Sequence, residues 1–157
     1  MASRVEATVR IAVLNGPNLN LLGVREPDLY GSTTLSQLEN GLAVVARDLG
    51  VSIECSQANG EGALIDIVHG YRGRIEGAVV NLGAYSHTSL ALRDALVGVH
   101  VPFVEVHVTN VYAREAERHH SMLAAAAIGV VVGLGTQGYE LALRGLVTSL
   151  RARGFAT

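Results

Sequence analysis

Lysine is absent from this sequence, and all twelve of its basic side chains are arginine. A chain without lysine cannot form a lysine Schiff base with a carbonyl substrate. It also cannot contain a phosphate-binding P-loop, because that motif needs a lysine to reach the phosphates. Imine catalysis through a lysine and P-loop nucleotide binding are therefore excluded.

The sequence also has few cysteines, a small net charge and no long apolar segment. Cys55 is the single cysteine, so no internal disulfide can form, and we expect a buried thiol in a reducing cytoplasm. A net charge of −2 gives no basis for binding nucleic acid or an anionic membrane. Residues 1–9 lack the apolar core of a signal peptide, and the apolar stretch 122–134 is too short to span a bilayer. We expect a cytoplasmic protein that binds neither nucleic acid nor a membrane.

Strand and helix patterns alternate along the chain. Five short runs, most of them continuously apolar, predict buried parallel strands at 10–14, 51–56, 78–82, 103–107 and 129–133. Helical patterns lie at 35–49, 62–72, 88–97 and 138–152, and we expect one helix or two short ones over 113–127. Thr34 and Gln37 predict a capping box, and Gly50 a helix end. The prediction is an α/β flavodoxin-like three-layer sandwich with strand order 2-1-3-4-5. We expect residues 1–157 to form one domain, with 1–9 as a flexible N-terminal arm.

Ligands in such sheets bind beyond the carboxyl ends of the strands, near the switch in strand order. The connection 15–33 is much longer than the usual loop of about 2–6 residues, which is typical of a functional loop. Polar residues follow three of the predicted strands at this edge, and they include Asn18, Asn81, His87 and His107.

Arg25 and Tyr30 lie together in this long connection. A phenol in water has a pKa of about 10 and is a poor base at neutral pH, but an adjacent guanidinium favours the phenolate. The pair is therefore a candidate general base. The alternative interpretation is a surface tyrosine with a solvated arginine.

Glu105 and His107 are two residues apart on one predicted strand, so their side chains share a face. A carboxylate beside an imidazole can fix its tautomer and favour its charged form, which suits a general acid. A purely structural histidine is the alternative.

Two further patterns have alternative interpretations. Arg114 and Arg118 would share a face if their segment were helical, which is typical either of an anion clamp or of a solvated rim. The adjacent His119 and His120 would point about 100° apart on a helix, which argues against a zinc site. The G-x-G-x-x-G match at 133–138 is followed by no strand with an acidic residue, so we expect helix packing there rather than dinucleotide binding.

Several short motifs together resemble those of the type II 3-dehydroquinate dehydratase family, the type II dehydroquinases. They recur in the family's order between about residues 10 and 147, nearly the whole chain. The matching segments are NGPNLNLLG at 15–23, REP at 25–27, YG at 30–31, HTS at 87–89, ALRD at 91–94, EVH at 105–107, ARE at 113–115, RHHS at 118–121 and the stretch 135–139.

The resemblance implies an anti elimination of water from 3-dehydroquinate through an enolate, giving 3-dehydroshikimate, with no metal or other cofactor. Tyr30 would be the base and Arg25 would stabilise its phenolate. Asn18 would support the enolate oxygen, and His107 would protonate the departing hydroxyl. The step belongs to the shikimate pathway of aromatic amino acid biosynthesis, and quinate catabolism uses the same step.

The resemblance also implies further contacts to the substrate and an assembly. The substrate's carboxylate and hydroxyls would be held by Asn81, His87, Arg118 and the backbone amides of Val108 and Thr109. Asp94 would reach the site of a neighbouring subunit, because the family forms a dodecamer, a tetramer of trimers. The family commonly has other residues at Leu82, Thr109, Tyr112 and within 124–127, which affects expected contacts more than chemistry.

The competing hypothesis is a non-catalytic flavodoxin-like binding or signalling module. A receiver domain on this fold needs an aspartate after the third strand and a lysine after the fifth. Asn81 and the absence of lysine argue against that class.

Overall fold

Five parallel strands form one sheet in the order β2-β1-β3-β4-β5 in the computed structural model, which describes residues 8–154. The strands are β1 (Arg10–Asn15), β2 (Ser52–Gln57), β3 (Gly77–Asn81), β4 (Phe103–His107) and β5 (Gly129–Val132). The predicted strands, their order and the fold class are confirmed, with strand ends shifted by at most one residue. Every residue of β3 and β4 is buried, whereas the edge strands β2 and β5 are partly exposed.

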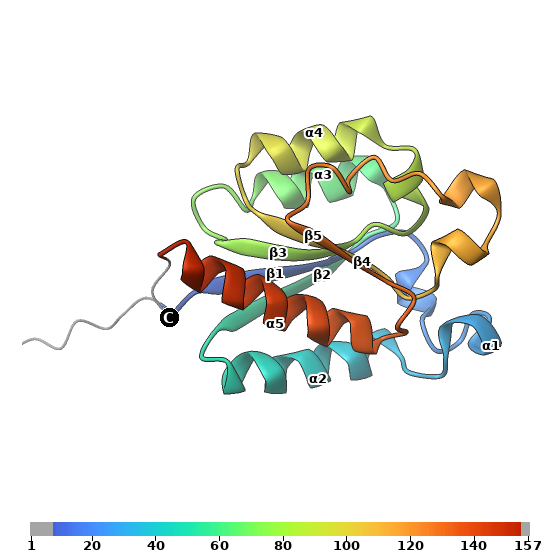
Figure 1. Ribbon diagram of the computed structural model, residues 1–157, viewed down its shortest axis with the longest axis horizontal. Coiled ribbons are helices and arrows are strands. Elements are labelled where there is room, and N and C mark those ends of the chain that lie inside the picture. Colours follow the sequence, from blue (N-terminus) through green and yellow to red (C-terminus); the bar gives the residue numbers. More distant parts are fainter. Residues whose placement is uncertain (1–7, 155–157) are drawn as a thin grey trace, which may run out of the picture.

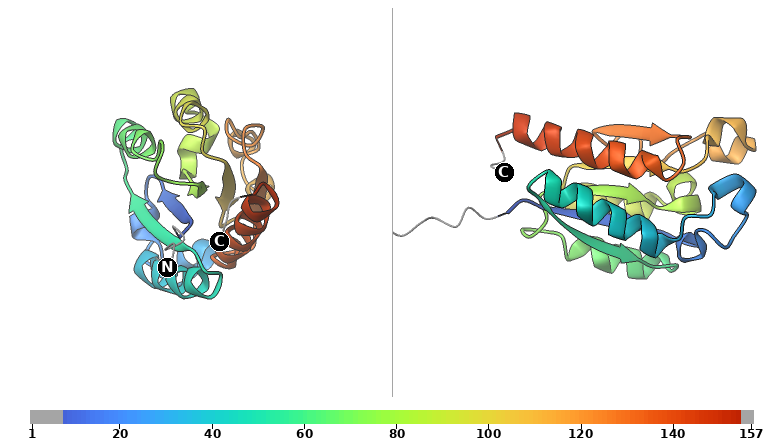
Figure 2. Two further views of the ribbon diagram at one scale, coloured as in Figure 1. Left: turned by 90° about the vertical axis from the view of Figure 1, so that its left-hand side faces the viewer. Right: turned by 90° about the horizontal axis from the view of Figure 1, so that it is seen from below.

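Helices cover both faces of the sheet, because successive strand residues point to opposite sides (Figure 1). Ile11 and Val13 pack in one core with α2 (Leu35–Asp48) and α5 (Gln137–Ala152). Ala12 and Leu14 pack in the other with α3 (Glu61–His69) and α4 (Leu90–Gly98). The end-on view in the left panel of Figure 2 shows the sheet between these two helical layers.

Helix α2 has the capping box that its sequence predicts. Thr34 Oγ1 accepts from the Gln37 amide at 3.2 Å, and Gln37 Oε1 accepts from the Thr34 amide at 3.0 Å. After the helix, Gly50 has a φ of 73°, the left-handed conformation that glycine adopts without strain. Both expectations for this helix are confirmed.

The segment 113–127 differs from its prediction. One single-turn 3₁₀ helix, η3 (Val111–Ala113), ends at its first residue, and a second, η4 (Ala116–Arg118), lies within it, followed by turns rather than an α-helix. Arg114, between them, has extended backbone at φ −105° and ψ −170°. The condition under which Arg114 and Arg118 would share a helix face is therefore not met, since no helix spans the two residues.

The connection 15–33 is also partly folded. It contains the 3₁₀ turn η1 (Leu19–Leu21) and the short helix α1 (Pro27–Tyr30). It projects beyond the same end of the sheet as the segment after β4 (Figure 1). This arrangement brings two long connections over the carboxyl ends of β1, β3 and β4.

The predicted N-terminal arm falls largely outside the described residues, since residues 1–7 are not among them. Val9, which we had included in the arm, is buried in the core, and its carbonyl accepts from the Ser52 amide at 3.0 Å. Within residues 8–154, no helix combines the length and apolarity needed to cross a membrane.

Candidate active site

A cavity of about 170 Å³ opens beyond the carboxyl ends of β1, β3 and β4. This is the switch point of the strand order, where ligands bind in open α/β sheets. Among its lining residues are Asn18, Arg25, Tyr30, Asn81, His87, His107, Val108, Thr109, Arg114 and Arg118.

Nine of the ten residues predicted from the sequence therefore lie around one cavity. The exception is Asp94, which lies on α4 with its side chain 66% exposed, next to Arg93 and away from this cavity. The cavity of this chain is thus built without Asp94.

Tyr30 is held between two arginines. The guanidinium of Arg114 donates to the phenol oxygen at 2.9 Å, and its central carbon lies 5.7 Å from the ring centroid. Arg25 lies over the same ring, with its guanidinium carbon 5.4 Å from the centroid. The predicted proximity of Arg25 and Tyr30 is confirmed, but the direct hydrogen bond comes from Arg114. Two guanidinium groups therefore lie against the Tyr30 phenol, one at its oxygen and one over its ring.

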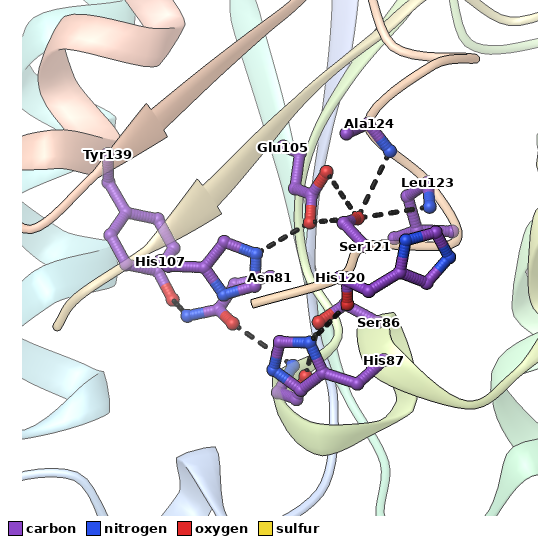
Figure 3. Close-up of polar contacts among 11 residues, drawn as sticks. Asn81, Ser86, His87, Glu105, His107, His120, Ser121, Leu123, Ala124 and Tyr139 are labelled. Carbon is purple, nitrogen blue, oxygen red and sulfur yellow. Dashed lines mark hydrogen bonds and ion pairs between the residues drawn. The ribbon is translucent and has the colours of Figure 1, made fainter. Parts of the chain in front are cut away.

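His107 is paired with a buried carboxylate, as the strand alternation predicts. Its Nε2 lies 2.6 Å from Glu105 Oε1, and the Glu105 side chain is fully buried. Ser121 Oγ donates to the Glu105 carboxylate, at 2.7 and 2.9 Å from its two oxygens. Ser121 Oγ also accepts hydrogen bonds from the backbone amides of Leu123 and Ala124 (Figure 3). Because a carboxylate only accepts, Nε2 carries a proton, and Nδ1 is left for chemistry outside the pair.

His87 stacks on His107, with ring centroids 5.8 Å apart and an angle of 18° between the rings. Its Nδ1 lies 2.8 Å from the carbonyl oxygen of His120, so this nitrogen is the donor. Burial lowers the pKa of His87 below its usual value, which favours the neutral ring with Nε2 as an acceptor.

Asn18 is fixed by its backbone rather than by its side chain. Its φ of 69° places it in the left-handed region, and its amide donates to Asn59 Oδ1 at 3.0 Å. Gln57 Nε2 donates to the same oxygen at 3.0 Å and to the Gly16 carbonyl at 3.1 Å. The Asn18 side chain is therefore carried on an anchored turn at the cavity wall.

Residues that depart from the family's usual pattern fit around the site. Thr109 Oγ1 accepts from Arg114 at 3.3 Å, so threonine supplies the hydroxyl that a serine would supply. Leu82 is fully buried, and the Tyr112 side chain is 64% exposed with its ring 6.1 Å from that of His119. None of these three departures replaces a residue proposed as the base, the acid or the arginine beside the base.

The glycine-rich stretch 133–138 serves packing, as expected. A Cβ on Gly138 would lie 3.3 Å from Val131 Cγ1, so this glycine allows α5 to rest closely on the sheet. Gly133 has a φ of 84° and approaches Asn110. Across the described residues, no group of three or more His, Cys, Asp and Glu is placed to hold a metal ion.

Cys55 is half-buried, and burial raises the pKa of its thiol to about 12. It lies on β2, and it does not line the cavity.

Sequence reasoning missed two contributors to the site. Arg114 was grouped with Arg118, and only its spacing was considered. Ser121 was noticed only within a motif. The signal for Arg114 was its position after β4, at the same sheet edge as Tyr30. The two residues are 84 positions apart, so no local pattern could pair them.

A cavity lined both by a histidine paired with a carboxylate and by a phenol bound to an arginine is typical of an enzyme that moves protons. Comparison with known proteins identifies which kind. The sequence pattern of the family described as Dehydroquinase class II matches residues 9–147. A 3-dehydroquinate dehydratase of Gemmatimonas aurantiaca is 58% identical over 147 residues, covering 94% of this chain and 97% of that protein. Catabolic 3-dehydroquinase 2 of Aspergillus flavus is 54% identical over 140 residues, covering 89% and 93%.

Solved structures agree with the sequence comparison. The crystal structure of type II dehydroquinase from Propionibacterium acnes superposes with a TM-score of 0.85 at 43% identity, covering 90% of this chain and 99% of that chain. The chain belongs to the class II dehydroquinase family, and it is an enzyme of the hydro-lyase class. The hypothesis of a non-catalytic module was therefore wrong.

Proposed function

We propose that this enzyme removes water from 3-dehydroquinate by anti elimination through an enolate, giving 3-dehydroshikimate. The observation that carries the proposal is one cavity lined by both a phenol held by arginines and a histidine paired with a carboxylate. The names of relatives that are more than half identical point to the same substrate.

The reaction needs a base for a weakly acidic proton and an acid for a poor leaving group. Tyr30, as phenolate, takes the proton from the carbon next to the ketone. The electron pair forms an enolate, and Asn18, with a bound water, supports its oxygen. The enolate then reforms the ketone while the β-carbon loses its hydroxyl.

His107 supplies the proton that turns this hydroxyl into water. The proton comes from Nδ1, since Nε2 is bound to Glu105. Before this transfer, the carboxylate of Glu105 balances the positive charge of the His107 ring. Ser121 holds that carboxylate in place through a hydrogen bond. Asn81, His87, Arg118 and the amides of Val108 and Thr109 hold the substrate's carboxylate and ring hydroxyls. One proton enters Tyr30, one leaves His107, and water is the second product.

An ultraviolet assay tests the proposal directly. The product is a conjugated enone, whereas the substrate is not, so absorbance should rise when the enzyme meets 3-dehydroquinate. Heat-denatured enzyme is the control. No absorbance change with folded protein would refute the proposed function.

Removing either arginine beside Tyr30 should slow turnover. A hydrogen bond to a charged group is worth about 1.5–3 kcal/mol, so we expect Arg114→Ala to lower kcat about 10- to 100-fold. We expect Arg25→Ala to lower kcat to a similar degree, because it removes the second charge over the ring. Steady-state kinetics measure both effects. Arg144→Ala, which breaks an exposed pair with Glu140 on α5, is the matched control. Near-normal kcat in both site variants would eliminate the mechanism.

We further propose that copies of the chain assemble as a tetramer of trimers in which Asp94 reaches the cavity of a neighbouring subunit. Asp94 is exposed on α4, beside a groove lined by Ile65, His69 and Arg72 of the α3 region. A carboxylate there is available to another copy and not to its own cavity.

Mixing two variants tests this arrangement. Asp94→Ala should keep its fold and raise KM about tenfold, the equivalent of one lost hydrogen bond. Refolding it together with inactive Tyr30→Phe should restore a near-normal KM, because hybrid sites combine Tyr30 of one copy with Asp94 of the other. Sedimentation measures the assembly. An unrestored KM in hybrid particles would contradict the shared site.

Two physiological roles use this step. We assign the enzyme to the shikimate pathway in the cytoplasm, because the dehydration of 3-dehydroquinate is a step of that pathway and a relative from Gemmatimonas aurantiaca has the name 3-dehydroquinate dehydratase. A role in quinate breakdown is the alternative, because fungal relatives of comparable identity are named catabolic dehydroquinases.

A further inference from the structure

A buried chain of hydrogen bonds joins the cavity residue Asn81 to the last helix. Tyr139, in the first turn of α5, is fully buried, and its hydroxyl lies between two asparagines. Asn81 Nδ2 donates to the Tyr139 oxygen at 2.8 Å, and the Tyr139 hydroxyl donates to Asn15 Oδ1 at 2.6 Å. Figure 3 shows the Asn81 amide held on one side by Tyr139. Asn15 and Asn81 end the neighbouring strands β1 and β3 and are register partners.

The direction of the chain is fixed by the backbone. The Gly83 amide can only donate, and it donates to Asn81 Oδ1 at 3.1 Å. Asn81 must therefore turn Nδ2 toward Tyr139. The Tyr139 oxygen accepts that hydrogen bond, so its own hydroxyl proton is the one that donates to Asn15. Burial raises the pKa of Tyr139 above its usual range, so the hydroxyl keeps this proton at any working pH. If the Asn81 side-chain amide were reversed, its NH₂ group would face the Gly83 N–H, and two donors would meet without an acceptor.

The cost of the arrangement indicates that it serves more than packing. Asn15 Nδ2 is buried without a hydrogen-bond partner among the described residues, which is unfavourable. An apolar core would avoid this cost. What the polar groups provide is one fixed orientation of Asn81, which lines the cavity and has a second Nδ2 proton that can donate to a ligand there.

We propose that Tyr139 is a positioning residue that holds the Asn81 amide with its donor toward the substrate. The inference rests on the proposed function, because Asn81 is taken there to bind the substrate. Tyr139 itself does not line the cavity, so it acts only through Asn81.

Tyr139→Phe should therefore weaken substrate binding more than it slows chemistry. We expect KM for 3-dehydroquinate to rise about tenfold while kcat stays within about threefold, since a misoriented amide affects ground state and transition state alike. Tyr71→Phe is the matched control. Tyr71 is equally buried, but its hydroxyl has no hydrogen-bond partner among the described residues, so its removal should leave KM within about twofold.

A double-mutant cycle separates positioning from a general loosening of the core. In the Asn81→Ala background, Tyr139→Phe should change KM by less than about twofold, because the residue through which it acts is gone. Equal effects of Tyr139→Phe in both backgrounds would overturn the proposal. If the unmodified enzyme does not turn over 3-dehydroquinate, the proposed function fails instead, and the two failures are distinct.

Neutron diffraction of the unmodified protein in D₂O needs no variant and no activity. A deuteron on Tyr139 directed at Asn15, with the Asn81 nitrogen facing Tyr139, would support the proposal even if Tyr139→Phe did not fold. A Tyr139 deuteron directed at Asn81 would overturn it.

Discussion

Tyr30→Phe is expected to lower kcat for 3-dehydroquinate by about 10²- to 10⁴-fold, the usual contribution of a positioned general base. The change removes only the phenol oxygen, which accepts from Arg114 at 2.9 Å. Both arginines would remain near an uncharged ring, but no group would be left to take the proton next to the ketone. Single-turnover absorbance of the enone measures the loss.

The fold should tolerate this substitution. Tyr30 is partly exposed, and one lost hydrogen bond costs about 0.5–1.5 kcal/mol of unfolding free energy. Tyr112→Phe, at a tyrosine whose side chain is 64% exposed and does not line the cavity, is the control for losing a phenol hydroxyl. Retention of more than a tenth of normal kcat by Tyr30→Phe would show that another group is the base.

His107→Gln should lower kcat by about 10²- to 10⁴-fold as well, for a different reason. The glutamine amide nitrogen can occupy the place of the imidazole Nε2 and donate to Glu105, so the buried carboxylate keeps a partner. An amide cannot deliver a proton to the departing hydroxyl. Choosing glutamine over alanine avoids an unpaired buried carboxylate, which would cost about 3–5 kcal/mol of stability.

Deuterium exchange tells the two variants apart. In D₂O, His107→Gln should still exchange the substrate proton next to the ketone, because Tyr30 and its arginines are intact. Tyr30→Phe should abolish both exchange and elimination. Mass spectrometry of recovered substrate measures the label. Exchange lost in His107→Gln but kept in Tyr30→Phe would reverse the assigned roles of base and acid.

The sheet and much of the site could be predicted because their signals are local. Five apolar runs separated by helical patterns give the strand order through the rules of connection and handedness. Parallel strands then bring their carboxyl ends together, which collects Asn81 and His107 at one edge. The Glu105–His107 pair follows from the two-residue period of a strand.

The contacts that could not be predicted come from segments whose sequences lack the hydrophobic periodicity of a helix or a strand. Arg114 lies in extended backbone between two 3₁₀ turns, and its partner Tyr30 lies in another irregular connection. Tertiary packing alone decides that they meet. Tyr139 lies at the start of the predicted helix 138–152 and ends the matching stretch 135–139, but nothing local shows that its hydroxyl would reach Asn81.

The reach of Tyr139 has a consequence during synthesis on the ribosome. Its partner Asn15 is made 124 residues earlier, and loops of that length close late because of their entropy cost. A nascent chain that has already formed β1 through β4 would present Asn81 with no phenol to orient it. Full affinity for the substrate would thus arise only when α5 has emerged and docked, so partly made chains would hold the metabolite more weakly than the finished enzyme.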